Sequence, residues 1–312
     1  MSKQQQSDLD AMLRKTPLDT AADVLTLRAV FEEVMRQVPV APDVRKTPIA
    51  VGGIGAIEVT IDGTDSADVI LYFHGGVYVI GSAAASVPLV SDLARRTATR
   101  VITVDYRLAP ENPYPAALQD ARAAYEGLLE QGIDPGRIAF AGESAGAGLA
   151  MATLLALRDA GKPLPSSAFL MSPYADLTLS GESVVDKEAL DPLLTPDGLR
   201  RRVTDYVADA DASDPYISPV QGDLTGLPPM LIQVGSHEVL LSDAIRLAAR
   251  AATADVAVTL DVVPGVPHVF QAYAAVLEEG DAALDRAATF LTANFAATHV
   301  RLDKGVGSQV HP

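Results

Sequence analysis

The sequence predicts an α/β fold in which a mostly parallel sheet of about eight strands is covered by helices on both faces. Short apolar runs alternate with helical patterns, as expected for repeated strand–helix units. These runs are almost continuously apolar, which is typical of strands buried on both faces. Ahead of them, Ile49–Val51 and Ile57–Ile61 flank a glycine-rich turn and predict an antiparallel hairpin at the sheet edge. The other expected strands are Val69–Phe73, Val101–Val104, Arg137–Phe140, Ala168–Met171, Met230–Val234 and Val258–Val263.

Two segments outside this alternation predict a helical cap. Asp23–Val38 carries apolar residues at spacings of three and four, which indicates an amphipathic helix before the sheet begins. A long segment ahead of Met230 contains Thr195 followed by proline, the pattern of a helix N-cap with proline at the first helical position. We expect residues of about 1–45 and 180–212 to cover one domain that spans residues 1–312.

Composition excludes several classes of protein. The 312 residues include 40 acidic and 24 Lys or Arg side chains, and the resulting formal charge of −16 repels nucleic acids and acidic membranes. The absence of cysteine excludes disulfides and thiolate chemistry. The N-terminus resembles no secretory signal, and no apolar run approaches the roughly 20 residues that cross a bilayer. We therefore expect a soluble, cytoplasmic protein, with residues 301–312 as an irregular tail.

Ser144 is the candidate nucleophile. It stands in the stretch Gly142-Glu143-Ser144-Ala145-Gly146, after the expected strand Arg137–Phe140 and before a helical pattern. Strand, G-x-S-x-G and helix in this order predict a nucleophile elbow, a strained turn that presents the serine hydroxyl. The flanking glycines are required because side chains there would collide where strand and helix meet. An ordinary glycine–serine turn is the alternative, and the flanking strand and helix argue against it.

A second motif, His74-Gly75-Gly76-Val77, follows the expected strand Val69–Phe73. Consecutive glycines allow backbone N–H groups to approach a substrate oxygen closely. We expect the N–H groups of Gly75, Gly76 and Ala145 to form an oxyanion hole. A glycine turn beside a structural histidine is the alternative interpretation, which the presence of the elbow in the same chain disfavours.

Over roughly residues 70–275 the sequence resembles the hormone-sensitive-lipase-like branch of bacterial carboxylesterases. The resemblance implies an α/β-hydrolase fold with a helical cap, hydrolysis of esters with short to medium acyl chains, and no cofactor. It also implies, for many members, a homodimer paired through the last strand. The motifs that carry it are His74-Gly75-Gly76, Asp105–Glu111 with Pro113–Pro115, the elbow at Ser144, Ser172-Pro173 and Pro267-His268.

His268 is the candidate base by elimination among five histidines. His74 belongs to the glycine motif, and His299 and His311 lie in or beside the C-terminal stretch. His237 precedes the acid candidate and is expected to be a loop neighbour. His268 follows the last expected strand, on the loop where the resemblance places the base that accepts the serine proton.

Glu238 is the predicted acid of the triad. The chain order Ser, acid, His requires a carboxylate between Ser144 and His268, and Glu238 follows a buried strand in that interval. Many relatives have Asp-Pro-Leu where this chain has Glu238-Val239-Leu240. Asp243, about one helical turn further on, is the alternative acid.

Several neighbours are expected to support the site rather than react. Polar residues of Tyr106–Glu111 should brace the oxyanion loop, and Glu143 should donate or accept a supporting hydrogen bond. Val77 stands where many relatives have glycine and is expected to alter pocket shape more than catalysis. Four residues are candidates for the pocket wall or, alternatively, for the core: Tyr78, Leu193, Leu194 and Tyr206.

Together these residues predict a carboxylesterase that works through an acyl-enzyme and takes a small ester as its partner. A lactone hydrolase or an amidase with the same triad is the alternative. A non-catalytic small-molecule receptor would have lost a triad residue, and all three are present. No cluster has metal-ligand spacing and no phosphate-binding glycine loop follows a strand, so we expect neither metal nor cofactor.

Overall fold

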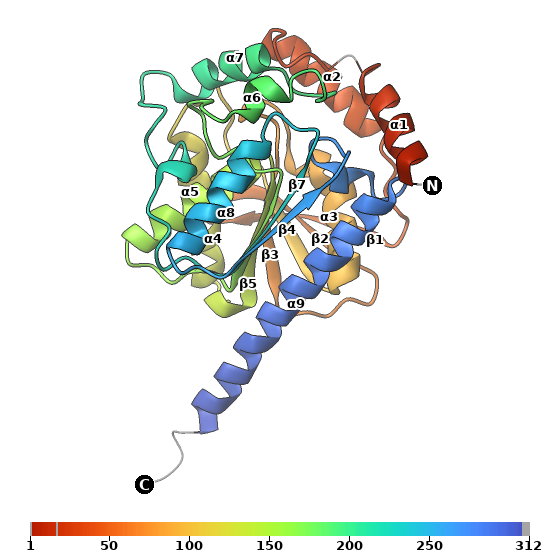
Figure 1. Ribbon diagram of the computed structural model, residues 1–312. Helices are drawn as coiled ribbons and strands as arrows, with labels where there is room; N and C mark the ends of the chain where they lie inside the picture. The colour runs from red at the N-terminus through yellow and green to blue at the C-terminus, as the bar shows by residue number, and fades with distance from the viewer. Residues whose placement is uncertain (1, 17, 308–312) are drawn as a thin grey trace.

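The strands form one eight-stranded sheet in the order β1-β2-β4-β3-β5-β6-β7-β8 (Figure 1). The computed structural model describes residues 2–16 and 18–307, with side chains through residue 298. Strand β2 is antiparallel to both of its neighbours, β1 and β4. All the other strand pairs are parallel. The predicted mostly parallel sheet is therefore confirmed. Its strands are β1 (Val44–Val51), β2 (Ile54–Ile61), β3 (Val69–Phe73), β4 (Arg100–Val104), β5 (Ile138–Glu143), β6 (Ser167–Met171), β7 (Met230–Gly235) and β8 (Val258–Val263).

Helices cover both faces of this sheet. Side chains alternate along β3, so that Leu71 and Phe73 join one apolar cluster while Ile70 and Tyr72 join another on the opposite face. Burial on both faces explains why the strands read as continuous apolar runs. The helices on the first face are α4 (Ala116–Glu130), α5 (Ala145–Asp159) and α8 (Leu241–Thr253), and those on the second are α3 (Ala83–Thr97) and α9 (Glu278–Gly307).

Gly52 and Gly53 make the tight turn of the β1–β2 hairpin. Their φ angles of 58° and 80° are left-handed, as a two-residue hairpin turn between twisted strands requires. A Cβ atom at Gly52 would lie 1.8 Å from the carbonyl oxygen of Ala123. The hairpin is longer than predicted because the turn takes only these two glycines, which leaves Ile54 and Gly55 within β2.

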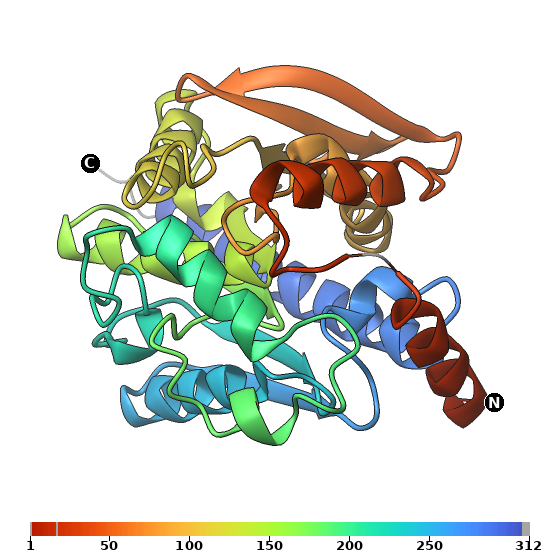
Figure 2. The same cartoon turned by 90° about the horizontal axis from the view of Figure 1, so that it is seen from above.

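Four helices, together with residues 187–195 that join the last two of them, lie above the carboxyl ends of the parallel strands, and we call them the cap (Figures 1 and 2). Thr195 accepts a hydrogen bond of 3.1 Å from the Gly198 N–H and so caps α7 as predicted. Helix α1 buries Leu9 and Leu13 against residues that follow β8. The cap helices are α1 (Ser2–Leu13), α2 (Val24–Arg36), α6 (Ser183–Asp186) and α7 (Pro196–Val207).

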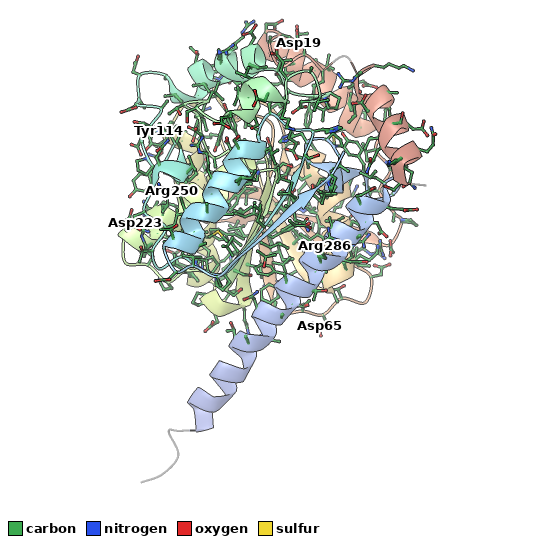
Figure 3. All side chains as sticks on the ribbon, in the orientation of Figure 1. Asp19, Asp65, Tyr114, Asp223, Arg250 and Arg286 are labelled. Atoms are coloured by element: carbon green, nitrogen blue, oxygen red, sulfur yellow. The ribbon has the colours of Figure 1, made fainter. Side chains whose placement is uncertain are left out.

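Tyr114, labelled in Figure 3, connects the cap to the body of the protein. Its N–H donates to the carbonyl oxygen of Tyr206 at 2.8 Å, and the two rings meet edge to face at 6.3 Å. Tyr206 also stacks on Tyr78 with ring centroids 3.8 Å apart. Of the two interpretations for Tyr78 and Tyr206, these contacts favour the core.

Helix α9 extends past the lower end of the sheet (Figure 1). It continues to Gly307, so the prediction of an irregular tail is wrong for residues 301–307, and residues 308–312 lie outside the described part. Extending an existing helix adds one backbone hydrogen bond per residue and needs no apolar periodicity. No helix within the described residues is both long enough and apolar enough to cross a membrane.

Candidate active site

Ser144 occupies the sharp turn between β5 and α5, as the elbow motif predicts. Its φ of 54° and ψ of −121° lie outside the ordinary regions for a residue with a side chain. A Cβ atom at Gly146 would lie 1.9 Å from the Phe73 carbonyl oxygen, and one at Gly142 would lie 2.7 Å from the Gly146 backbone. The two glycines therefore allow the strand and helix to approach closely enough to hold the serine.

We expect Gly146→Ala to lower the free energy of unfolding by about 3 kcal/mol or more, because the added methyl group would overlap the backbone of β3. Urea denaturation followed by circular dichroism measures the change. Gly55→Ala is the matched control, since a Cβ atom there meets nothing within 4 Å. Equal unfolding midpoints for the two variants would contradict this account of the elbow.

The structure brings His268 and Glu238 together. His268 Nδ1 lies 2.7 Å from Glu238 Oε2, and both side chains are buried. The other carboxylate oxygen, Oε1, accepts hydrogen bonds from the Ser172 hydroxyl at 2.8 Å and from the Gly235 N–H at 2.5 Å. Glu238 thus has every acceptor oxygen occupied and can hold the imidazole in one orientation.

Electrostatics in this pair favours a charged imidazole. Burial opposes a charge on the ring, but the carboxylates of Glu238, Asp191 and Glu143 outweigh it and raise the pKa of His268 above its usual value. Burial raises the pKa of Glu238, and the imidazole and the hydrogen bonds to its carboxylate act in the opposite direction. The raised pKa makes His268 a stronger proton acceptor, as a general base requires.

Asp243, the alternative acid, bonds elsewhere. Its Oδ2 accepts hydrogen bonds of 2.9 Å from the N–H groups of Ala175 and Asp176. Burial, together with the carboxylate of Asp176, raises the pKa of Asp243 to about 8. Asp243 therefore does not contact His268: α8 turns its side chain toward the segment after β6, whereas Glu238 precedes the helix and reaches His268.

The other histidines whose side chains are described, His74 and His237, do not bond to Glu238 or His268. His74 Nδ1 lies 2.7 Å from the Gly75 carbonyl oxygen, and its ring stacks on Tyr106 at 4.1 Å. Burial lowers the pKa of His74 to about 4, so its ring is neutral at pH 7. His237 is a loop neighbour that donates its backbone N–H to Val266. The side chains of His299 and His311 lie outside the described part of the chain.

The oxyanion loop differs from prediction at one position. The Gly75 N–H donates to Glu143 Oε1 at 2.7 Å, so the prediction that it faces a substrate oxygen is wrong. Among the described residues, neither the Gly76 nor the Val77 N–H has a hydrogen-bond acceptor, and Ala145 begins α5 with its N–H unpaired. Gly76 and Val77 have φ angles of 113° and 47°. The sequence analysis considered only the side chain of Val77 and did not consider its N–H, because a free backbone donor has no signature in the side chain.

The loop is supported from behind, as predicted. Glu143 accepts from Gly75 and also from the Tyr72 hydroxyl, and burial raises its pKa to about 7. The Tyr106 hydroxyl donates to the His74 carbonyl oxygen at 2.7 Å. Glu111 pairs with Arg28 at 2.8 Å, and Arg28 donates in turn to the loop carbonyl of Val79 at 2.8 Å. These contacts confirm that Tyr106–Glu111 braces the loop.

A cavity of about 340 Å³ opens over Ser144 and His268. The cap supplies much of its apolar lining, and the predicted wall residues Leu193 and Leu194 take part. Between the described side chains of Ser144 and His268 no hydrogen bond forms, although both line this cavity. Its other apolar walls include Met12, Leu13, Phe31, Val34, Met35, Ile80, Leu89 and Tyr273.

The fold and the elbow define an α/β hydrolase. The sequence profile of the α/β hydrolase fold matches residues 70–272, so the chain belongs to that family. It is 49% identical over 222 residues to an acetyl-hydrolase of Streptomyces hygroscopicus, which covers 71% of this chain and 74% of that protein. It is 39% identical over 288 residues to an esterase of Acinetobacter venetianus, covering 92% and 94%.

Solved structures agree with these relatives. An esterase from the bacterial hormone-sensitive lipase family superimposes with a TM-score of 0.90 at 37% identity, covering 94% of this chain and 98% of the other. A hormone-sensitive lipase from a metagenome library gives a TM-score of 0.89 at 39% identity, covering 93% and 98%. The protein is therefore an ester-hydrolysing enzyme of the hormone-sensitive-lipase-like type.

Proposed function

We propose that Ser144, His268 and Glu238 form the catalytic triad of a carboxylesterase. Two observations together carry this proposal. His268 Nδ1 and Glu238 Oε2 form a hydrogen bond of 2.7 Å, and His268 lines the same cavity as the strained Ser144. A serine hydroxyl is a weak nucleophile until a base accepts its proton. Substrate binding would bring the hydroxyl and His268 Nε2 into contact, since catalytic hydrogen bonds often tighten only in the complex.

Hydrolysis would proceed through an acyl-enzyme. Ser144 Oγ attacks the ester carbonyl carbon while its proton moves to His268 Nε2, and Glu238 stabilises the imidazolium that results. The N–H groups of Gly76, Val77 and Ala145 hold the oxyanion, at the N-terminus of α5. Collapse of the intermediate breaks the bond to the alcohol, which takes the proton from His268. A water molecule then repeats the sequence and releases the acid.

The lining of the cavity favours esters with short to medium acyl chains as substrates. Its lining is mainly apolar, and no Lys or Arg is among the described residues that line it. An uncharged, apolar chain would gain from burial there, whereas a carboxylate in the chain would lose its hydration without a counter-charge. We infer that esters from acetate to about hexanoate fit best.

Covalent labelling tests the proposal directly. A fluorophosphonate should inactivate the enzyme because Ser144 Oγ forms a bond to phosphorus as fluoride leaves. Mass spectrometry of the digested protein should place one adduct on the peptide that contains Ser144. Before labelling, a p-nitrophenyl ester series from acetate to laurate should show hydrolysis of the shorter chains. After labelling, the same series should show no hydrolysis. An adduct on another serine, or no hydrolysis at all, contradicts the proposal.

A further inference from the structure

Asp191 lies in the cap between α6 and α7 and is buried, with 5% of its surface exposed. Its Oδ1 accepts hydrogen bonds from the N–H groups of Leu193 at 2.9 Å and Leu194 at 3.0 Å. Its Oδ2 accepts a third from the Val239 N–H at 3.0 Å. One carboxylate therefore joins a wall of the substrate cavity to the residue that follows Glu238.

The cap holds Val239 at a second point. The Ser183 hydroxyl donates to the Val239 carbonyl oxygen at 2.7 Å and accepts from the Ser242 N–H at 2.8 Å. Both backbone polar groups of Val239 are thus bonded to cap residues. Because Glu238 is its neighbour in sequence, a displacement of this part of the cap would be transmitted to the acid of the triad.

We propose that Asp191 is a positioning residue that couples the cavity wall at Leu193 and Leu194 to the loop carrying Glu238. The inference rests on the proposed function of the triad. Leu193 and Leu194 line the cavity together with Ser144 and His268, so the acyl chain would contact the wall that Asp191 fixes. Substrate packing and triad alignment then depend on the same side chain.

The coupling requires a backbone N–H at the residue after Glu238. A proline at that position would have no N–H to donate. Here Val239 supplies one. The Leu241 N–H bonds to the Glu238 carbonyl oxygen at 3.2 Å, and Leu240 has φ −91° and ψ 8°, which are the marks of a type I turn with Val239 at its second position. Proline is favoured at that position, so Val239→Pro removes the donor and suits the turn.

Asp191 also contributes charge to the site. Three carboxylates favour the protonated ring of His268, those of Glu238, Asp191 and Glu143. Without the charge of Asp191 the pKa of His268 should fall. Since the base must be neutral to accept a proton, the acidic limb of the kcat/KM profile should then move to lower pH. A purely structural role would leave that limb in place.

Three variants test the coupling. Asp191→Asn keeps an oxygen for Leu193 and Leu194 but cannot accept from Val239 and carries no charge. Val239→Pro removes the same hydrogen bond and leaves the charge of Asp191 intact. Asp186→Asn, at an exposed position of α6 in the same segment, is the matched control. Each is assayed with p-nitrophenyl acetate and hexanoate across pH, with thermal unfolding as a check on folding.

We expect Asp191→Asn and Val239→Pro each to lower kcat/KM for the hexanoate about tenfold, and the acetate less, with Asp186→Asn within twofold of wild type. The acidic limb should move to lower pH in Asp191→Asn alone. The inference is overturned if kcat/KM of both variants stays within twofold of wild type. It is also overturned if kcat/KM falls equally for both esters and the acidic limb of Asp191→Asn does not move. An inactive wild-type protein would instead contradict the proposed function.

Discussion

Ser144→Ala is expected to lower kcat for p-nitrophenyl butyrate by about 10⁴-fold or more, with little change in KM. The substitution removes the atom that bonds to the acyl carbon, and no other described serine stands at the elbow between β5 and α5. The cavity walls and the N–H groups of Gly76 and Val77 remain, so binding should persist. Initial rates under saturating substrate give kcat, and matching circular dichroism spectra show that the variant is folded.

Ser86→Ala is the control for this experiment. Ser86 lines the same cavity, and its hydroxyl donates at 3.0 Å to the carbonyl oxygen of Ser82, the N-cap residue of α3. Loss of this hydroxyl should change kcat by less than about threefold, because it does not take part in bond making. If Ser144→Ala kept more than a few per cent of wild-type kcat, Ser144 would not be the nucleophile.

The sequence predicted the sheet and the elbow well because both depend on local pattern. Apolar runs located all eight strands, and the glycines at 142 and 146 marked the turn between β5 and α5. Such signals are carried by a few adjacent residues, so no knowledge of tertiary contacts is needed. The length of β1 could not be predicted this way, since four successive exposed residues, Arg45–Pro48, follow the buried Val44 without strict alternation.

The partners of individual polar groups could not be predicted from the sequence. The Gly75 N–H turns to Glu143 because β3 and β5 are neighbours in the sheet, although the two residues are far apart in the chain. The contact between Asp191 and Val239 likewise joins the cap to the loop after β7. Motif spacing placed Gly75 and Glu143 near the site but did not identify Asp191, and only packing assigns these hydrogen bonds.

The choice between Glu238 and Asp243 shows the same limit. Both carboxylates follow β7 and precede the base, so either one is compatible with the chain order Ser, acid, His. In the fold they point in different directions: Glu238 toward His268, and Asp243 toward the backbone of Ala175 and Asp176. The direction depends on where α8 begins, at Leu241, which places Asp243 on the face of the helix turned toward the core.

Glu238→Gln is accordingly expected to lower kcat by about 10³-fold to 10⁴-fold. The amide keeps one oxygen for the Ser172 hydroxyl and the Gly235 N–H, so its NH₂ group would face His268 Nδ1. That arrangement favours the tautomer protonated at Nε2, which cannot accept the serine proton. The pH dependence of kcat for p-nitrophenyl butyrate, measured beside wild type, gives the size of the loss.

Asp243→Asn is the matched control, because it converts the other buried carboxyl group after β7 into an amide. We expect it to keep kcat within about threefold of wild type. The pKa of about 8 leaves Asp243 protonated at pH 7, so a neutral amide replaces a neutral acid. Since the folded-state pKa lies above that of the unfolded chain, wild type loses stability as pH rises from about 4 to 8, and the variant should lose less over that range. Urea midpoints at pH 6 and pH 9 measure this difference. A larger fall in kcat for Asp243→Asn than for Glu238→Gln would exchange the two roles.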